Sequence, residues 1–222
     1  NLWALKKVGA GFKAQCFNVA LGLTILLLIT ILTDLTGKGL QWLSLGIGIY
    51  CAVSWVQSLV CRDPVCFGLI FKCKTLCYLY IAIGFNVFTS MAIVFWGIPY
   101  YRRFHGIEAA EIGSLMGLFM AIGGFIGVML GGVLADRLRL HNQKAKLNIC
   151  LCGWFLALLA ALSMLLVENV HLAYACSFVF FLTVPLGQAP IISTINDLMI
   201  PRTRAVGTAM NILIPTFMGV AL

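Results

Sequence analysis

The stretch Gly131-Gly-Val-Leu-Ala-Asp-Arg137 marks the point where a glycine-rich apolar segment meets a basic turn. The 24 residues that precede Asp136, residues 112–135, carry no charge. At about 1.5 Å per residue, a helix of that length crosses the hydrocarbon core of a bilayer. The next charged residues are all basic: Arg137, Arg139, Lys144 and Lys146. We therefore predict a membrane-spanning helix that ends on Asp136 and Arg137 at the membrane surface.

Composition extends this prediction to the whole chain. Hydrophobic residues make up 62% of the 222 residues and charged residues 10%, and the mean hydropathy is +1.03. In soluble domains, apolar residues make up roughly 45–50% of the chain and charged residues about 25%. Because backbone groups in lipid must be satisfied within the chain, we expect an all-α, polytopic helical bundle. The net charge is +8, but the basic residues lie between apolar runs and do not form one basic face. We therefore expect no nucleic acid as partner.

Seven apolar segments follow one another without a Pro/Ser-rich linker. Basic residues concentrate on alternate connections, so the positive-inside rule predicts a cytoplasmic N-terminus for this chain and a multi-pass integral membrane protein. The connections assigned to the outside hold three basic residues, Lys38, Arg102 and Arg103. The cytoplasmic connections hold twelve, namely Lys6, Lys7, Lys13, Arg62, Lys72, Lys74, Arg137, Arg139, Lys144, Lys146, Arg202 and Arg204. The segments cover residues 17–35, 40–57, 76–99, 112–135, 147–167, 171–192 and 205–222.

Short motifs in the chain resemble one transporter superfamily. The stretch Gly132-Val-Leu-Ala-Asp136-Arg137 resembles the signature loop of the major facilitator superfamily, although the glycine and two basic residues that follow in that pattern are here Arg139, Leu140 and His141. Residues 95–106 with 110–113, and residues 201–209, resemble stretches of spinster-like transporters beside helices seven and eleven. Arg62-Asp-Pro64 resembles the segment before their helix seven.

This resemblance implies a bundle of the major facilitator type, of which the chain would cover about helices five to eleven. Residues 1–60 would be the last two helices of the N-terminal bundle, residues 61–75 a cytoplasmic connection and residues 76–222 the C-terminal bundle, truncated in its fifth helix. The odd number of spans, the lack of an initiator Met and the end inside an apolar run also lead us to expect part of a longer protein.

The resemblance also implies a function. We expect a secondary transporter that moves a lipid-derived amphiphile, of lysophospholipid or sphingolipid type, by alternating access. Two alternatives stay open: a permease for a polar organic anion or sugar, and a non-transporting membrane receptor or scaffold. A polar anion would call for a basic residue in mid-membrane, and the seven segments hold none. The expected partners are this substrate, membrane lipids and, if transport is ion-coupled, a proton or ion whose acidic residue would lie in helices one to four.

Residues Gly132, Asp136 and Arg137 are the candidates for a conformational switch loop. Asp136 follows a helix C-terminus, where the macrodipole disfavours an anion by a few tenths of a kcal/mol. Arg137 and Arg139 can compensate it, and the resemblance implies docking against the helix N-terminus at residues 12–16. The alternative is a solvated loop charge. Upstream, Gly123, Gly127 and Gly131 recur every four residues, which predicts close packing of a neighbouring helix.

The candidate substrate-binding residues lie in the third and sixth segments. Phe85, Thr89, Trp96 and Tyr100 share one helical face, and Asn86 and Ser90 lie alongside. An aromatic stripe is more often plain packing, but buried amides and hydroxyls need partners. In the sixth segment, Pro185, Gly187 and Pro190 predict a broken helix, which membranes tolerate beside a cavity. The candidates for substrate binding are Asn86, Thr89, Ser90, Trp96, Tyr100 and Gln188.

We expect no enzymatic activity, cofactor or metal. No Walker loop, Ser/His/Asp arrangement or pair of carboxylates is present in the sequence. Nine cysteines occur, of which four cluster at Cys61, Cys66, Cys73 and Cys77. Their spacing does not match a zinc site and no His lies nearby, so small apolar residues or palmitoylation sites are the preferred interpretation over a metal site.

Overall fold

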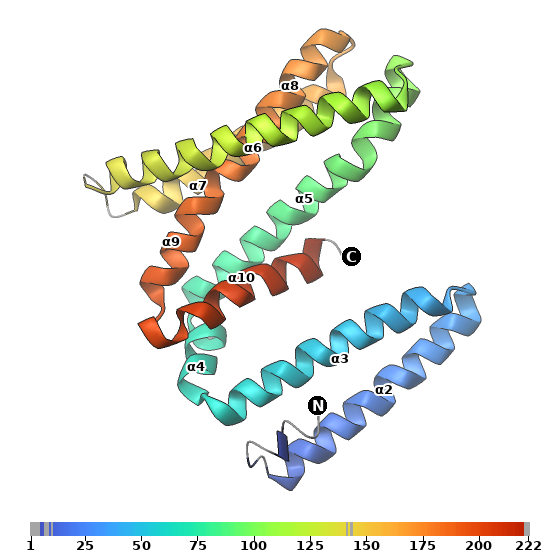
Figure 1. Ribbon diagram of the computed structural model, residues 1–222, viewed down its shortest axis with the longest axis vertical. Coiled ribbons are helices and arrows are strands. Elements are labelled where there is room, and N and C mark those ends of the chain that lie inside the picture. Colours follow the sequence, from blue (N-terminus) through green and yellow to red (C-terminus); the bar gives the residue numbers. More distant parts are fainter. Residues whose placement is uncertain (1–4, 7–8, 10, 141, 143, 220–222) are drawn as a thin grey trace. The chain divides into compact units, whose positions relative to one another are not determined.

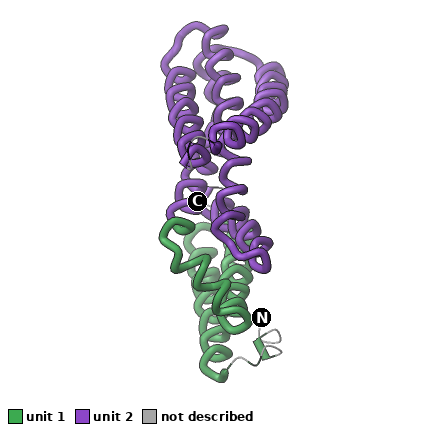
Figure 2. Tube along the Cα trace, turned by 90° about the vertical axis from the view of Figure 1, so that its left-hand side faces the viewer, with its two compact units in different colours: residues 1–77 green, residues 78–222 purple. Residues whose placement is uncertain are grey.

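The computed structural model describes residues 5–6, 9, 11–140, 142 and 144–219, and the regular structure in these ranges is all helical (Figure 1). Lys7, His141 and residues 220–222, on which parts of the predictions above rest, lie outside the described residues. The chain divides into two compact units, residues 1–77 and 78–222 (Figure 2). The division falls in the first turn of α5 (Lys74–His105).

Six helical runs are long and apolar enough to cross a membrane. This number supports a multi-pass integral membrane protein, and the six runs correspond to the first six apolar segments of the sequence. The seventh segment forms α10 (Arg204–Gly219), whose predicted end lies beyond the described residues. The six runs are α2 (Phe12–Thr36), α3 (Gly39–Arg62), α5, α6 (Ala109–Arg139), α7 (Ala145–Leu166) and the interrupted run Val170–Leu198.

In the first unit, α2 and α3 form a helical hairpin that is held together by polar side chains. Gly37 ends α2 with a φ of +70°, a left-handed conformation that suits glycine. The side chain of Asn18 is fully buried and donates to Ser54 Oγ (3.1 Å) and Gln57 Oε1 (3.0 Å) on α3. Tyr50 in turn donates its hydroxyl to Asn18 Oδ1 at 2.7 Å. These four residues belong to none of the motifs recognised in the sequence.

A short helix, α4 (Pro64–Lys72), occupies the predicted cytoplasmic connection. Its start follows from the Asp63-Pro64 pair. The Asp63 carboxylate accepts a hydrogen bond from the Cys66 backbone N–H at 3.1 Å, and Pro64 takes the first helical position, where an N–H is not needed.

In the second unit, α6 packs through the glycine stripe against α8 (Val170–Thr183) and the turn that follows α8, as the sequence predicted. A methyl group at Gly123 would lie 3.0 Å from the backbone nitrogen of Leu182. One at Gly127 would overlap the carbonyl oxygen of Leu182, and one at Gly131 that of Leu186. Backbone therefore lies directly on backbone, the arrangement that small residues allow in lipid. Gly117 and Gly124, by contrast, have no such neighbour.

The predicted break in the sixth segment is confirmed. Helix α8 ends at Thr183, a 3₁₀ turn η1 covers Val184–Gly187, and α9 spans Gln188–Leu198. Pro185 lies inside the turn. Pro190, which was also expected to break the helix, lies in the first turn of α9, where a missing N–H is tolerated.

Two helices extend further than the sequence analysis predicted. Helix α5 includes Pro99 and continues to His105, beyond the expected end at residue 99. Helix α6 continues to Arg139. Of the candidate switch-loop residues, Gly132 lies on the helix as the predicted span required, and Asp136 and Arg137, predicted at the helix end, lie in its last turn. The helix continues past Arg137 because the next two residues, Leu138 and Arg139, are good helix formers and not the Gly or Pro that would end it.

Candidate functional site

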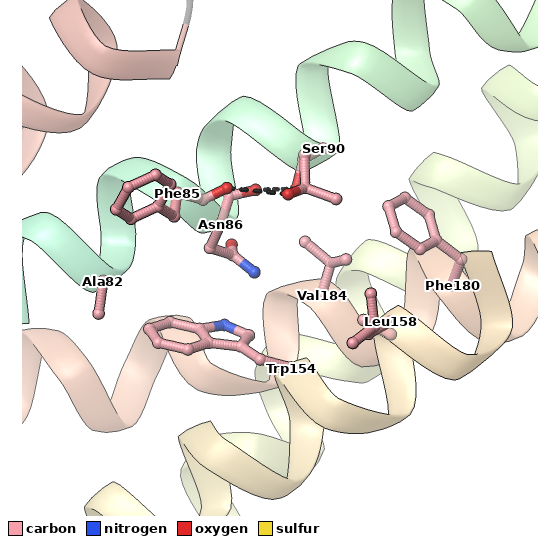
Figure 3. Close-up of a pocket in the computed structure, with 10 residues that line it drawn as sticks. Ala82, Phe85, Asn86, Ser90, Trp154, Leu158, Phe180 and Val184 are labelled. Carbon is pink, nitrogen blue, oxygen red and sulfur yellow. Dashed lines mark hydrogen bonds between the residues drawn. The ribbon is translucent and has the colours of Figure 1, made fainter. Parts of the chain in front are cut away.

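A pocket of about 200 Å³ lies between α5, α7 and α8 in the second unit (Figure 3). Three of the predicted substrate-binding residues, Asn86, Thr89 and Ser90, line it from α5. The ten lining residues include no charged side chain. The others are Ala82 and Phe85 from α5, Trp154, Ala157 and Leu158 from α7, and Phe180 and Val184 from the α8 side.

The two hydroxyls in this pocket are bonded within their own helix. Thr89 donates to the carbonyl of Phe85 at 3.0 Å, and Ser90 donates to the carbonyl of Asn86 at 2.7 Å. Such bonds satisfy a hydroxyl proton in an apolar environment. What remains available toward the pocket is acceptor capacity on each oxygen.

Asn86 and Trp154 supply the donors of the pocket. The carboxamide of Asn86 points from α5 toward the indole of Trp154 on α7 (Figure 3). In the described part of the chain, neither the carboxamide nor the indole N–H has a hydrogen-bond partner. Both groups can therefore bond a ligand oxygen or a water molecule between them, and such a hydrogen bond contributes about 0.5–1.5 kcal/mol net.

Trp96 and Tyr100 line a second pocket, of about 250 Å³, further along the same pair of helices. Its other walls are almost entirely apolar: Ala92, Ile93 and Gly97 from α5, and Met164 and Leu165 from α7. Tyr100 donates its hydroxyl to the carbonyl of Leu165 at 2.8 Å, so that its polar end is already paired. Trp96 is 72% exposed at the rim.

Gln188 lines neither of these pockets. It is the first residue of α9 and its side chain is exposed. The structure therefore brings Asn86, Thr89 and Ser90 together, places Trp96 and Tyr100 at a neighbouring pocket, and puts Gln188 at the surface of the unit. Its role in substrate binding stays a prediction.

The predicted switch residues lie at the end of α6. Asp136 and Arg137 are exposed, and within the described residues neither makes an ion pair. Gly132 lies closer to the neighbouring helix, where an added methyl group would be 3.7 Å from Ala189 Cβ. The docking of Asp136 on residues 12–16 would join the two units and also stays a prediction.

An ion pair near this end, between a buried lysine and a half-exposed aspartate, could not be recognised from the sequence. Lys146, with a side chain only 7% exposed, donates to Asp197 Oδ2 at 2.6 Å and to Ser193 Oγ at 2.7 Å. Arg139, expected to compensate Asp136, instead lies 3.8 Å from Asp197. These contacts tie the start of α7 and the end of α6 to α9. Lys146 was counted as a loop charge because it precedes an apolar run by one residue.

Trp154 was also missed, although the sequence carries a signal for it. Tryptophan is enriched at membrane interfaces, where its N–H can reach water. Trp154 lies near the middle of α7, far from both helix ends. A tryptophan in that position needs a polar partner from another helix, and the structure places Asn86 opposite it.

Comparisons of the chain with protein-family models, with curated proteins and with solved structures gave no match. The classification of the chain therefore depends on its own sequence and structure. These indicate a polytopic membrane protein with six candidate spans.

Proposed function

We propose that this chain is part of a secondary transporter of the major facilitator type, similar to spinster-like transporters, that moves a lipid-derived amphiphile by alternating access. In this proposal α2 and α3 are the last helices of an N-terminal bundle, and α5 to α10 belong to the C-terminal bundle. The motif resemblances and the broken run α8–η1–α9 support it, because interrupted helices line substrate paths in transporters.

The observation that carries the proposal is the order of the two pockets along α5 and α7. The pocket at Asn86 and Trp154 offers hydrogen-bond donors and acceptors, and the pocket at Trp96 offers apolar walls. A molecule with a polar group at one end and a hydrocarbon tail at the other matches this order. The neutral donors suit hydroxyl, amide or ester oxygens of such a lipid.

The pockets argue against a polar organic anion as substrate. The residues that line them include no Lys, Arg or His among those described. An anion in a dry pocket needs a counter-charge, because the cost of burying an isolated charge far exceeds that of a neutral polar group. Among the described residues no feature favours a receptor or scaffold. Measured transport of a substrate distinguishes a transporter from those classes.

Uptake of labelled lysophospholipid or sphingoid lipid into proteoliposomes, with the complete polypeptide that contains this chain, tests the proposal. Asn86→Leu should raise the concentration for half-maximal uptake two- to tenfold, since one amide hydrogen bond contributes about 0.5–1.5 kcal/mol. Thr216→Val on α10 is the matched control, because its hydroxyl is bonded to its own helix, outside both pockets. Absence of uptake for every amphiphile, with sugar or anion uptake present, would reject it.

A further inference from the structure

A groove of about 400 Å³ lies on the second unit between the end of α6 and the start of α7, apart from the two pockets of the proposed transport site. Its walls are mainly apolar, and Leu186 of η1 lies among them. The remaining lining residues are Leu134, Leu138, Asn142, Ala145, Asn148, Ile149, Cys152, Gly153 and Leu156. Polar side chains occur only toward the connection between the helices, at Asn142 and Asn148.

The length of the groove matches half of a bilayer. Its α7 wall runs from Ala145 to Leu156, which spans about 17 Å at 1.5 Å per residue. The hydrocarbon core of a membrane is about 30 Å thick, so each leaflet supplies about 15 Å. An acyl chain of one leaflet therefore fits along the groove, with its headgroup at the level of the α6–α7 connection.

The charges at that level are unbalanced in favour of cations. Arg139 and Lys146 are engaged with Asp197. Arg137 and Lys144 are exposed and have no acidic partner in the described ranges.

Helical geometry places these two free cations beside the groove and the local acid away from it. Lys144 precedes the groove residue Asn148 by four positions, so it lies on the same helix face. Arg137 lies three positions after Leu134, again on a neighbouring face. Asp136 is two positions from both Leu134 and Leu138 and thus points to the opposite side of α6.

We propose that this groove binds an anionic diacyl phospholipid of the bilayer, with the acyl chain along α6 and α7 and the headgroup at Arg137 and Lys144. Basic clusters beside membrane helices attract anionic lipids in this way. The inference does not depend on the transported substrate, since the groove shares no lining residue with either transport pocket.

The test uses the full chain in lipid nanodiscs, with a fluorophore at position 151. Leu151 is 63% exposed and adjoins the groove residue Cys152 without lining the groove itself. The label is attached to Leu151→Cys in a variant whose nine cysteines are replaced. At equal lipid content, spin-labelled phosphatidylserine should quench the fluorophore more than spin-labelled phosphatidylcholine does. Each of the two cations should raise the apparent affinity for phosphatidylserine about fivefold.

The variants separate the headgroup from the acyl chain. Arg137→Gln with Lys144→Gln should bring the two lipids to equal quenching, whereas Arg103→Gln, an exposed cation at the end of α5, should leave the preference intact. Cys152→Phe, used as the cysteine replacement at that position, fills the groove and should weaken quenching by both lipids. Equal quenching in the starting protein, or a preference that survives the double substitution, would overturn the proposal.

A competition arm identifies the source of the lipid. Unlabelled diacyl phosphatidylserine should displace the spin-labelled lipid. Displacement by an anionic lysophospholipid and not by diacyl lipid would make the groove a substrate site and refute the bilayer lipid. All variants should elute as monodisperse protein, because each substitution in the headgroup set lies on an exposed side chain.

Discussion

The α2–α3 hairpin and the α6–α8 interface hold membrane helices together by different means, the first by hydrogen bonds and the second by close backbone packing. Lipid gives helices no hydrophobic reason to associate, so contacts must come from hydrogen bonds or from close packing. In the hairpin, Asn18 is completely buried and bonds to three side chains of α3. Between α6 and α8, Gly123 and Gly127 bring one backbone onto the other, and Gly131 does the same at the turn η1 that follows α8. The first interface depends on which polar atoms are present, and the second on the absence of side-chain atoms.

This difference predicts different kinds of sensitivity. A hydrogen-bonded interface loses a definite number of bonds when one partner is removed. In the hairpin, a methyl group added at Gly46 would meet the side chain of Ile29, which can move, and not backbone. The glycine interface has no side-chain hydrogen bond that a substitution could remove, but it has no room for an added side chain. The following substitutions test this contrast, beginning with the one that should do most damage.

Gly127→Leu should have the largest effect on folding. Its side chain would overlap the carbonyl oxygen of Leu182, and backbone cannot move aside as a flexible side chain can. Overpacking of this kind costs about 1–3 kcal/mol even in cores that can relax, so we expect loss of most folded protein. Folded yield by size-exclusion chromatography in detergent is the measurement. Gly124→Leu on the same helix, with open space around it, is the control and should fold normally.

Asn18→Leu should have an intermediate effect. It removes the three hydrogen bonds of Asn18 and leaves polar atoms of Ser54, Gln57 and Tyr50 without that partner. Bonds between membrane helices average about 0.6 kcal/mol, so the free energy of unfolding should fall by about 1–2 kcal/mol. Titration with SDS would measure this loss.

Thr24→Val in α2 is its control, because the Thr24 hydroxyl bonds only to the carbonyl of Ala20 in its own helix. A loss as large for Thr24→Val as for Asn18→Leu would show that the hairpin does not rely on the bonds between helices.

Asp197→Asn should cost about 1 kcal/mol. The substitution leaves the ammonium of Lys146 buried beside a neutral amide, but Ser193 still accepts a hydrogen bond from it. The exposure of the Asp197 side chain, 49%, keeps the loss well below that of a fully buried pair. Thermal unfolding in detergent should show a small decrease. The double variant Lys146→Met with Asp197→Asn should recover part of it, because no buried charge remains.

Asp136→Asn should have the smallest effect on folding and a clear one on uptake. The carboxylate is exposed and unpaired within the described ranges, so the folded yield should match the unmodified protein. If this charge biases two conformations of the proposed transporter, the uptake rate should fall severalfold. Asp34→Asn, also an exposed carboxylate late in a membrane helix, is the control. Uptake at the unmodified rate would end the interpretation of Asp136 as a switch.

Features encoded locally were the predictable ones. Long uncharged runs predicted the spans, and the four-residue glycine spacing predicted the packing face of α6. Pro185 and Gly187 predicted the break at η1. Features that join distant residues were missed: Asn18 and Ser54 are 36 positions apart, and Lys146 and Asp197 are 51 apart. A polar residue in an apolar run indicates that a partner exists but not which one. Gln188 illustrates the limit, since helical spacing alone could not place its side chain relative to the pocket.

The prolines of the interrupted run and the glycines of α6 form a complementary set. Proline has no N–H to donate to the carbonyl four positions earlier, so Pro185 deprives Phe181, and Pro190 deprives Leu186, of its usual helical donor. Both carbonyls lie against the glycine face, near Gly123 and Gly131. There the Cα–H groups of glycine can act as weak donors, worth about 0.5–1 kcal/mol each. A change at Pro190 and a change at Gly131 should therefore be non-additive, because each residue makes the other tolerable.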